Sequence, residues 1–349
     1  RRMPVLRVEA TLVERAHEMD PADLADLSGH GEPLDERLRL VLLCAHPRLA
    51  REHAAALTLR LVLGVPTAEI ARLFLVPVPT MAARLTRARK RLADATFEVP
   101  TGAELDQRVG VVADVAYLAF TAGYAPGEGE DVLRADVAAE AIRLVRVLRS
   151  VLPETYAGHP ELDALLALML LQHSRRHARV AADGSLVLLP DQDRSRWDAA
   201  AVAEALGLLA PLVHARPSTY LLQALVAAEH AVAPTAAETD WARVVRHYDE
   251  LLSLGESPVV RLNRAVAVAE ADGPQAGLAA LDGLVLPGHR LPAVRATLLA
   301  RAGRHEEAVD AYDEALAGCG NAAEAAHLAD RRAESSDVIR RGGTDVPSA

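Results

Sequence analysis

Apolar side chains recur every three or four positions along most of the chain, which is the period of an amphipathic α-helix. In the most regular stretch the apolar positions are Ile70, Leu73 and Phe74, followed by Met81, Leu85, Ala88 and Leu92. Residues 76–79, with the sequence Val-Pro-Val-Pro, interrupt this period because proline lacks a backbone donor and disfavours helix in the residue before it. The pattern therefore predicts a helix-turn-helix from Thr67 to Arg91, with Thr67 as the N-cap of the first helix and Thr80 opening the second.

The same period continues through the rest of the chain with only short breaks, so we expect helix after helix. Two helices are expected in residues 34–63, split at His46-Pro47. The later ones are expected at residues 103–122, 132–152, 160–180, 195–215, 218–232, 239–254, 258–271, 274–285, 291–302, 305–317 and 321–335. Because 51% of the residues are hydrophobic but only 3% are aromatic, the cores must be close-packed Ala, Leu and Val. The predicted fold class is all-α, and residues 338–349 are expected to be a disordered tail.

The last expected helices carry a repeat-like spacing. Gly303, Ala308, Tyr312 and Ala315 follow the small–small–aromatic pattern of the second helix of a TPR repeat, and Gly277 and Leu281 repeat it loosely about one period earlier. Such helix pairs bury a core only by stacking, so the pattern predicts a TPR-like array. Two roles are open for it: binding of a peptide or protein, or self-packing as a cap on the helix-turn-helix domain.

Positive charge is concentrated on the helix-turn-helix segment. Residues 51–95 hold eight arginines and lysines and three acidic residues, a net charge of +5, whereas the whole chain carries −10. Arg84, Arg87, Lys90 and Arg91 share one side of the second helix with Thr80 and Ala83. A basic patch in an acidic protein is the electrostatic footprint of a nucleic-acid site, although a solvated face on a structural helix has the same composition.

Residues 35–91 resemble region 4 of bacterial sigma-70 family factors, most closely the extracytoplasmic-function subfamily with a long C-terminal extension. The specific matches are DERLRL followed by Cys-x-His-Pro, then ALTLRL, then AEIA-x-x-FLVP-x-x-TMA-x-RL-x-RA. A second stretch, DGSLVLLPDQDRSRWD at residues 183–198, resembles the signature of that extension. Leu43 stands where the family usually has a second cysteine, and Pro79 replaces a residue more favourable to helix.

The resemblance implies that this domain reads the −35 promoter element and contacts core RNA polymerase. The DNA-binding residues that it implies, together with the basic residues of the same face, are Thr80, Met81, Ala83, Arg84, Arg87, Lys90 and Arg91. The implied organisation is a linker remnant at residues 1–32, the region 4 domain at 33–97, a helical connecting region at 98–190 and the TPR-like domain at 191–337. Region 2, which melts the −10 element in the family, has no counterpart in residues 1–32.

The motifs give no indication of catalysis, a cofactor or a metal site. Cys44 and His46 supply two ligands where a structural zinc site needs four, so a buried thiol and a helix-ending His-Pro are expected instead. His173 and His177 have the i, i+4 spacing of zinc proteases but enclose Arg175 and Arg176 without a glutamate, and a structural role is expected. Residues 191–194 offer either a polar pocket or a well-capped turn, of which the turn is favoured.

The expected function is promoter recognition and transcription initiation by a non-enzymatic sigma factor. Its expected partners are promoter DNA, core RNA polymerase and a regulatory protein on the TPR-like domain. The alternative is an interaction scaffold or a transcriptional regulator that lacks initiation activity. Neither a signal peptide nor an apolar run of about 20 residues is present, so no membrane contact and a cytoplasmic location are expected.

Overall fold

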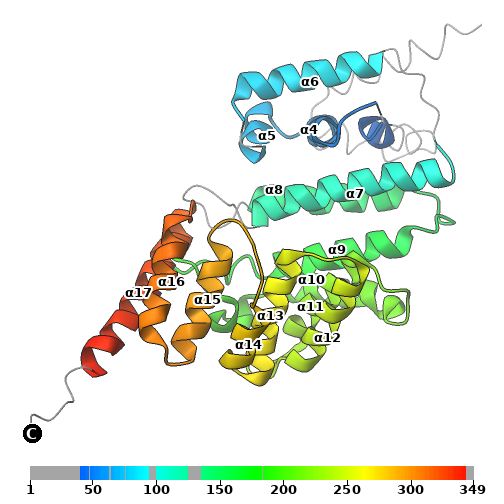
Figure 1. The fold of residues 1–349 in the computed structure, drawn as a ribbon. Helices are drawn as coiled ribbons and strands as arrows, with labels where there is room; N and C mark the ends of the chain where they lie inside the picture. Colours follow the sequence, from blue (N-terminus) through cyan, green and yellow to red (C-terminus); the bar gives the residue numbers. More distant parts are fainter. Residues whose placement is uncertain are drawn as a thin grey trace, which may run out of the picture. The chain divides into compact units, whose positions relative to one another are not determined.

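The computed structural model describes residues 40–46, 48–62, 64–74, 76–93, 100–124, 135–182 and 184–342, and throughout them the fold is all-α (Figure 1). Residues 40–44 are helical. The helices that follow are α4 (Arg51–Leu61), α5 (Thr67–Leu73), α6 (Val78–Ala93), α7 (Ala103–Tyr124), α8 (Ala135–Val151), α9 (His159–Ser174), α10 (Ala199–Leu209), α11 (Thr219–Val232), α12 (Trp241–Leu254), α13 (Pro258–Asp272), α14 (Pro274–Ala280), α15 (Arg290–Arg301), α16 (His305–Ala317) and α17 (Ala322–Gly342). None of these described helices combines the length and low charge that a membrane crossing requires.

Several predicted helix ends were wrong, each for a local reason. The helix expected at residues 160–180 ends at Ser174, whose carbonyl oxygen accepts from the backbone N–H of Asp198 at 2.9 Å. The helix expected from Ser195 begins only after Asp198, the N-cap, whose side chain accepts from the N–H of Ala201. The helix expected at residues 274–285 ends at Ala280, and the chain then turns at Gly283, where φ is +69°.

The predicted tail and linker have separate outcomes. Residues 338–342 are helical, because α17 extends to Gly342, so the expectation of disorder from residue 338 was wrong there. Residues 343–349 and the linker remnant at residues 1–32 lie outside the described part of the chain. The boundaries predicted at residues 97 and 190 stay predictions.

The chain divides into two compact units, and α9 crosses from the first to the second between Leu166 and Ala167. The first unit holds α4 to α8. Within it, α7 packs against both α8 and α4. Arg108 of α7, a buried side chain, donates to the carbonyl oxygen of Leu42 at 3.4 Å and to Glu104 at 2.6 Å. A buried guanidinium therefore attaches α7 to the helical residues 40–44.

The second unit is an array in which each helix from α11 to α17 packs on the next along the chain (Figure 1). Its apolar core is continuous because successive clusters share helices. One cluster joins α11, α12 and α13, a second joins α13 and α15, and a third joins α15, α16 and α17. Neighbour-on-neighbour burial is how helical repeats acquire a core.

The residues of the repeat-like spacing occupy close-packed positions. Ala308, Tyr312 and Ala315 are fully buried, and Gly303 adopts a φ of +77° between α15 and α16. Gly277 of α14 lies so close to α13 that an added Cβ would be 2.4 Å from the Cβ of Ala269. The spacing therefore marks real helix contacts, while the assignment of the array to the TPR class stays a prediction.

Candidate nucleic-acid interface

The helix-turn-helix is formed by α5 and α6, and its turn is fixed by backbone hydrogen bonds. The carbonyl oxygen of Pro66 accepts from the N–H groups of Glu69 and Ile70 at 3.0 Å each. Pro66 therefore occupies the N-cap position, and Thr67, predicted to be the cap, is the first helical residue. The N–H of Val76 donates to the carbonyl oxygen of Ala71 at 3.0 Å, which closes the end of α5.

The second helix starts two residues before the predicted Thr80. The N–H of Met81 donates to the carbonyl oxygen of Pro77 at 3.1 Å, and α6 runs from Val78. Pro79 then sits in the first turn, where an N–H would have no intrahelical partner and the fixed φ of proline suits the helix. The prolines that break the apolar period thus also set the start of the recognition helix.

One face of α6 is buried as the apolar spacing predicted. Its buried side chains are Met81, Leu85, Ala88 and Leu92, none more than 6% exposed. Contacts with α4 and α5 hold this face, and Ile70 and Ala71 of α5 are fully buried beside it. The packing fixes the rotation of α6, and therefore which side chains remain outside.

Met81 belongs to this core and not to the DNA-facing set in which the resemblance had placed it. Its side chain is 0% exposed, so it has no surface with which to touch a base. Including it was wrong because the helical period assigns it to the same face as Leu85. Met81 acts on the interface only by holding α6 in place.

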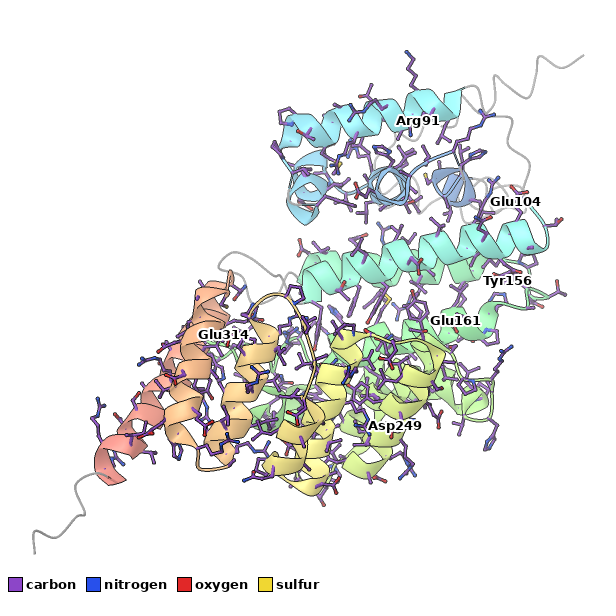
Figure 2. The ribbon with its side chains drawn as sticks, viewed as in Figure 1. Arg91, Glu104, Tyr156, Glu161, Asp249 and Glu314 are labelled. Atoms are coloured by element: carbon purple, nitrogen blue, oxygen red, sulfur yellow. The ribbon has the colours of Figure 1, made fainter. Side chains whose placement is uncertain are left out.

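The opposite face of α6 is exposed and carries no acidic residue. The exposed positions are Val78, Pro79, Thr80, Ala82, Ala83, Thr86, Arg87, Lys90 and Arg91. Arg91 is labelled near the C-terminal end of α6 in Figure 2. The structure brings the predicted residues Thr80, Ala83, Arg87, Lys90 and Arg91 onto this one face, and Arg84 lies at its edge with a side chain 24% exposed. The prediction missed four exposed positions, Val78, Pro79, Ala82 and Thr86, although the helical period alone could have added the last two.

Arg84 differs from the other basic residues because it has an acidic partner. Its Nη1 atom lies 3.5 Å from Oε2 of Glu52, which belongs to α4. By contrast, Arg87, Lys90 and Arg91 form no ion pair with any residue that the structure describes. A long, half-exposed pair of this kind contributes little stability. Glu52 is therefore a weak partner for Arg84. Arg87, Lys90 and Arg91 have no acidic partner among the described residues that a nucleic acid would have to displace.

The cations of α6 also act on a neighbouring histidine. Burial lowers the pKa of His53 on α4, and the charges of Arg91, Arg84 and Arg87 lower it further. His53 and Glu52 are thus part of the electrostatic surroundings of the α6 face. Sequence reasoning missed both, because they lie about 30 residues away in the chain and no local pattern connects them to α6.

Arg89 is part of the basic run in the sequence but not of this face. Its side chain is half-buried, its Nε atom has no hydrogen-bond partner, and burial lowers its pKa, assisted by the charge of Arg60. It lies on the inner side of α6, next to Cys44. Counting charges along the sequence therefore overstates the basic face by one arginine.

The metal and pocket candidates have structural explanations. Cys44 is fully buried, and burial raises the pKa of its thiol to about 12. Burial lowers the pKa of His173 to about 4, with the charge of Arg176 acting in the same direction. Neither residue belongs to a group of three metal-ligating side chains among the described residues.

The stretch at residues 191–198 is a capped turn, as the favoured interpretation held. Asp193 accepts from the N–H and the hydroxyl of Ser195 at 2.9 and 2.6 Å. Arg194 donates to the carbonyl oxygens of His230 and Ala233 at the end of α11, and its guanidinium lies 4.7 Å from the ring centre of Trp197. The backbone of the preceding segment pairs across Val180 and Leu186 in one antiparallel bridge.

Comparison with known proteins adds independent information to this geometry. Residues 39–92 match the family described as sigma-70, region 4, and residues 108–213 match a family of unknown function, DUF6596. The "Uncharacterized protein R00370" of Rhizobium meliloti (strain 1021) is 42% identical over 316 residues, which cover 88% of this chain and 73% of that protein. The chain belongs to the same family as this Rhizobium protein. Its segment from α4 to α6 is a sigma-70 region 4 domain. No solved structure matches the chain.

Proposed function

We propose that this protein is an RNA polymerase sigma factor of the extracytoplasmic-function type, in which α6 recognises the −35 element of a promoter. The observation that supports this most directly is the exposed face of α6, on which Arg87, Lys90 and Arg91 have no acidic partner among the residues that the structure describes. A buried core fixes the rotation of the helix that carries them. The match to sigma-70 region 4 supports a DNA-binding role for the same segment.

In this proposal α6 enters the major groove with its N-terminal half toward the bases. Thr80 offers a hydroxyl that donates to or accepts from a base edge, and Ala83 offers a methyl group that suits a thymine. Arg84, released from Glu52, reaches a guanine or a phosphate. Arg87, Lys90 and Arg91 contact phosphates and set the register of the helix on the duplex.

The proposed partners beyond DNA are core RNA polymerase and a regulatory protein. We place the regulatory contact on the α11–α17 array as a TPR-like surface. A hollow of about 450 Å³ lies on this array between α14, α15 and α16, lined by Leu278, Leu299, Arg295, Asp282 and Glu307 among others. A side chain of the partner would enter it. Binding to polymerase and promoter would place the protein in the cytoplasm.

The test is assembly with purified bacterial core RNA polymerase, using this chain as given and a second version with a sigma region 2 joined to its N-terminus. Promoter DNA is selected from a library of random −35 hexamers by each assembled complex. The proposal expects the version with region 2 to bind polymerase, to enrich one hexamer and to initiate transcription from it. Arg87→Ala in that version is expected to weaken binding to all promoter sequences about equally while polymerase binding persists.

Two other results would change the account. Polymerase binding without initiation by either version would indicate a regulator that uses the region 4 fold. Absence of polymerase binding by both would overturn the sigma-factor proposal and favour the interaction scaffold.

A further inference from the structure

Three potential metal ligands from two separate chain segments meet at one corner of the helical array. His289 directly precedes α15, Cys319 follows α16, and Glu324 lies in the first turn of α17. A ring nitrogen of His289, the sulfur of Cys319 and a carboxylate oxygen of Glu324 all lie within 4.8 Å of one another. No other group of three such ligands is this close in the described part of the chain.

The backbone around these ligands is held in place by its own contacts. Asn321, whose side chain is buried, accepts through Oδ1 from the N–H groups of Ala323 and Glu324 at 3.1 Å each and so caps α17. The segment from α16 also passes close to α15, because a Cβ added at Gly318 would lie only 3.4 Å from the backbone nitrogen of His289. The site is therefore largely formed before any ligand binds.

The side chains themselves need only a small movement. Nε2 of His289 lies 2.8 Å from Oε2 of Glu324, and the Cys319 sulfur lies 3.5 Å from the carbonyl oxygen of Asn321. In a tetrahedral zinc site with bonds of about 2.0–2.3 Å, the ligand atoms are about 3.3–3.8 Å apart. The His289–Glu324 hydrogen bond would open slightly to admit an ion.

We propose that His289, Cys319 and Glu324 bind a transition-metal ion of the zinc class, with a fourth coordination position left open. The donor set supports this choice, because calcium and magnesium prefer oxygen ligands alone whereas imidazole and thiolate select zinc and its neighbours. One thiolate and one carboxylate neutralise a divalent cation, which suits a half-buried position. The exposed fractions of the His289 and Glu324 side chains, 16% and 34%, leave a path for the ion.

The bound ion would connect the start of α15 to the start of α17, across the cluster that joins α15, α16 and α17. Binding would release the Cys319 thiol proton, since the ligand is the thiolate. The proposal does not rest on DNA binding by α6. It makes the last helices of the array responsive to metal supply or to oxidation of Cys319.

The test uses the full chain, freed of metal with a chelator and then titrated with Zn²⁺ alone, followed by calorimetry and by the metal content after dialysis. Titration with Co²⁺ adds a readout specific to sulfur, because a Co²⁺–thiolate bond absorbs in the near ultraviolet. One equivalent of Zn²⁺ is expected to bind and to raise the Tm. Cys319→Ser is expected to remove the Co²⁺–thiolate absorption, and His289→Gln and Glu324→Gln are expected to weaken Zn²⁺ binding by more than the ~10–100-fold loss typical of second-shell changes.

Matched controls separate the site from general effects of the substitutions. Cys44→Ala removes the other cysteine, exposed His214→Gln removes a histidine, and Glu314→Gln makes the same change on the exposed side of α16 (Glu314 is labelled in Figure 2). Each should bind Zn²⁺ like the parent chain, and circular dichroism verifies that every variant is folded. Absence of stoichiometric binding to the parent chain, or unchanged binding in folded Cys319→Ser and His289→Gln, would overturn the proposal.

Discussion

The α6 helix and the α12–α17 array use arginine in opposite ways. Residues 78–93 carry five basic side chains and no acidic one, and of these only Arg84 has an acidic partner among the described residues. Residues 241–342 carry twelve arginines and fifteen acidic residues. Many of those arginines bridge neighbouring helices: Arg243 pairs with Glu229, Arg264 with Asp249, Arg301 with Glu270, and Arg332 with Asp313.

This difference agrees with the proposed DNA-binding role of α6. An arginine that already has a carboxylate must exchange it for a phosphate, which reduces the free energy gained on binding. Arg87, Lys90 and Arg91, which have no acidic partner among the described residues, would bind DNA without this competition and would add the release of counterions. The predictions that follow test whether the two regions really differ in this way.

The largest effect is expected from removing the unpaired cations. The combined variant Arg87→Ala, Lys90→Ala, Arg91→Ala should lose at least ~100-fold in affinity for promoter DNA at moderate salt, and its log–log salt slope should become shallower by about 2.7. Fluorescence anisotropy over a series of salt concentrations measures both quantities. Arg246→Ala, an exposed change on α12, is the matched control and should leave them unchanged. An unaltered slope in the triple variant would remove α6 from the interface.

The one paired arginine of α6 offers a finer test. Arg84→Ala should weaken binding to the preferred sequence by ~1–3 kcal/mol and relax the choice of base. Glu52→Gln should act in the opposite direction, because it removes the carboxylate that competes for Arg84. Competition assays with single-base variants of the promoter measure the discrimination. Weaker binding in Glu52→Gln would show that the pair positions Arg84 and does not restrain it.

Substitution of two glycines by alanine distinguishes the effect of close packing in the array from the effect of helix propensity. Gly277→Ala should destabilise the protein by ~1–3 kcal/mol, because the new Cβ meets Ala269 at 2.4 Å and the carbonyl oxygen of Ala265 at 3.0 Å. Gly207→Ala on α10, where nothing lies within 4 Å, should stabilise it by ~0.5–1 kcal/mol. Urea unfolding compares the two. Equal effects would mean that α13 and α14 do not pack as closely as described.

The array should also lose stability in mild acid. Burial lowers the pKa of His230 to about 4, and the charges of Arg175 and Arg194 lower it further. The unfolded chain binds a proton at this histidine below pH ~6.5, and the folded chain only below about 4. Stability is therefore complete above pH 6.5 and falls as the pH drops from 6.5 to 4.

Thermal unfolding between pH 7 and pH 4 measures this loss. His230→Gln should flatten the profile and leave the part due to the other histidines with lowered pKa values, among them His173, whose pKa is also about 4, and His53. His214→Gln, an exposed change, should leave the profile like that of the parent chain. A profile that stays equally steep in His230→Gln would mean that His230 is protonated as readily in the folded as in the unfolded chain.

The smallest effect is expected from removing an ion pair between two helices of the array. Arg332 donates to both carboxylate oxygens of Asp313, at 2.5 and 2.9 Å, but both side chains are exposed. Arg332→Ala should lower the Tm by no more than about 2 °C and should not change DNA affinity. Calorimetry and anisotropy measure the two quantities. A loss of DNA affinity comparable to that of Arg87→Ala would erase the distinction between the two regions.

Local pattern was sufficient to predict the helices and the buried face of α6. The 3.6-residue period identified Leu85, Ala88 and Leu92 as core, and the structure buries all three. The start of α6 was placed two residues late, because sequence alone does not say which carbonyl accepts the first hydrogen bond. Here it is that of Pro77, so Val78 and Pro79 are helical.

Contacts between distant segments could not be predicted in the same way. Glu52 reaches Arg84 across 32 positions, and Arg108 reaches Leu42 across 66, without any periodic signal that joins them. The proximity of Cys319 to His289 depends on how α15, α16 and α17 stack. Such pairs follow from tertiary packing, which residue spacing does not encode.

The most direct test of the central claim is the salt dependence of promoter binding. It uses polymerase assembled with the version of the chain that has region 2 joined to it. That version carries either the parent α6 or the three substitutions Arg87→Ala, Lys90→Ala and Arg91→Ala. The account predicts one preferred −35 sequence and a steep salt slope for the parent, and weaker binding with a shallower slope for the variant. Equal slopes and equal affinities in the two assemblies would contradict the claim that the unpaired cations of α6 contact DNA.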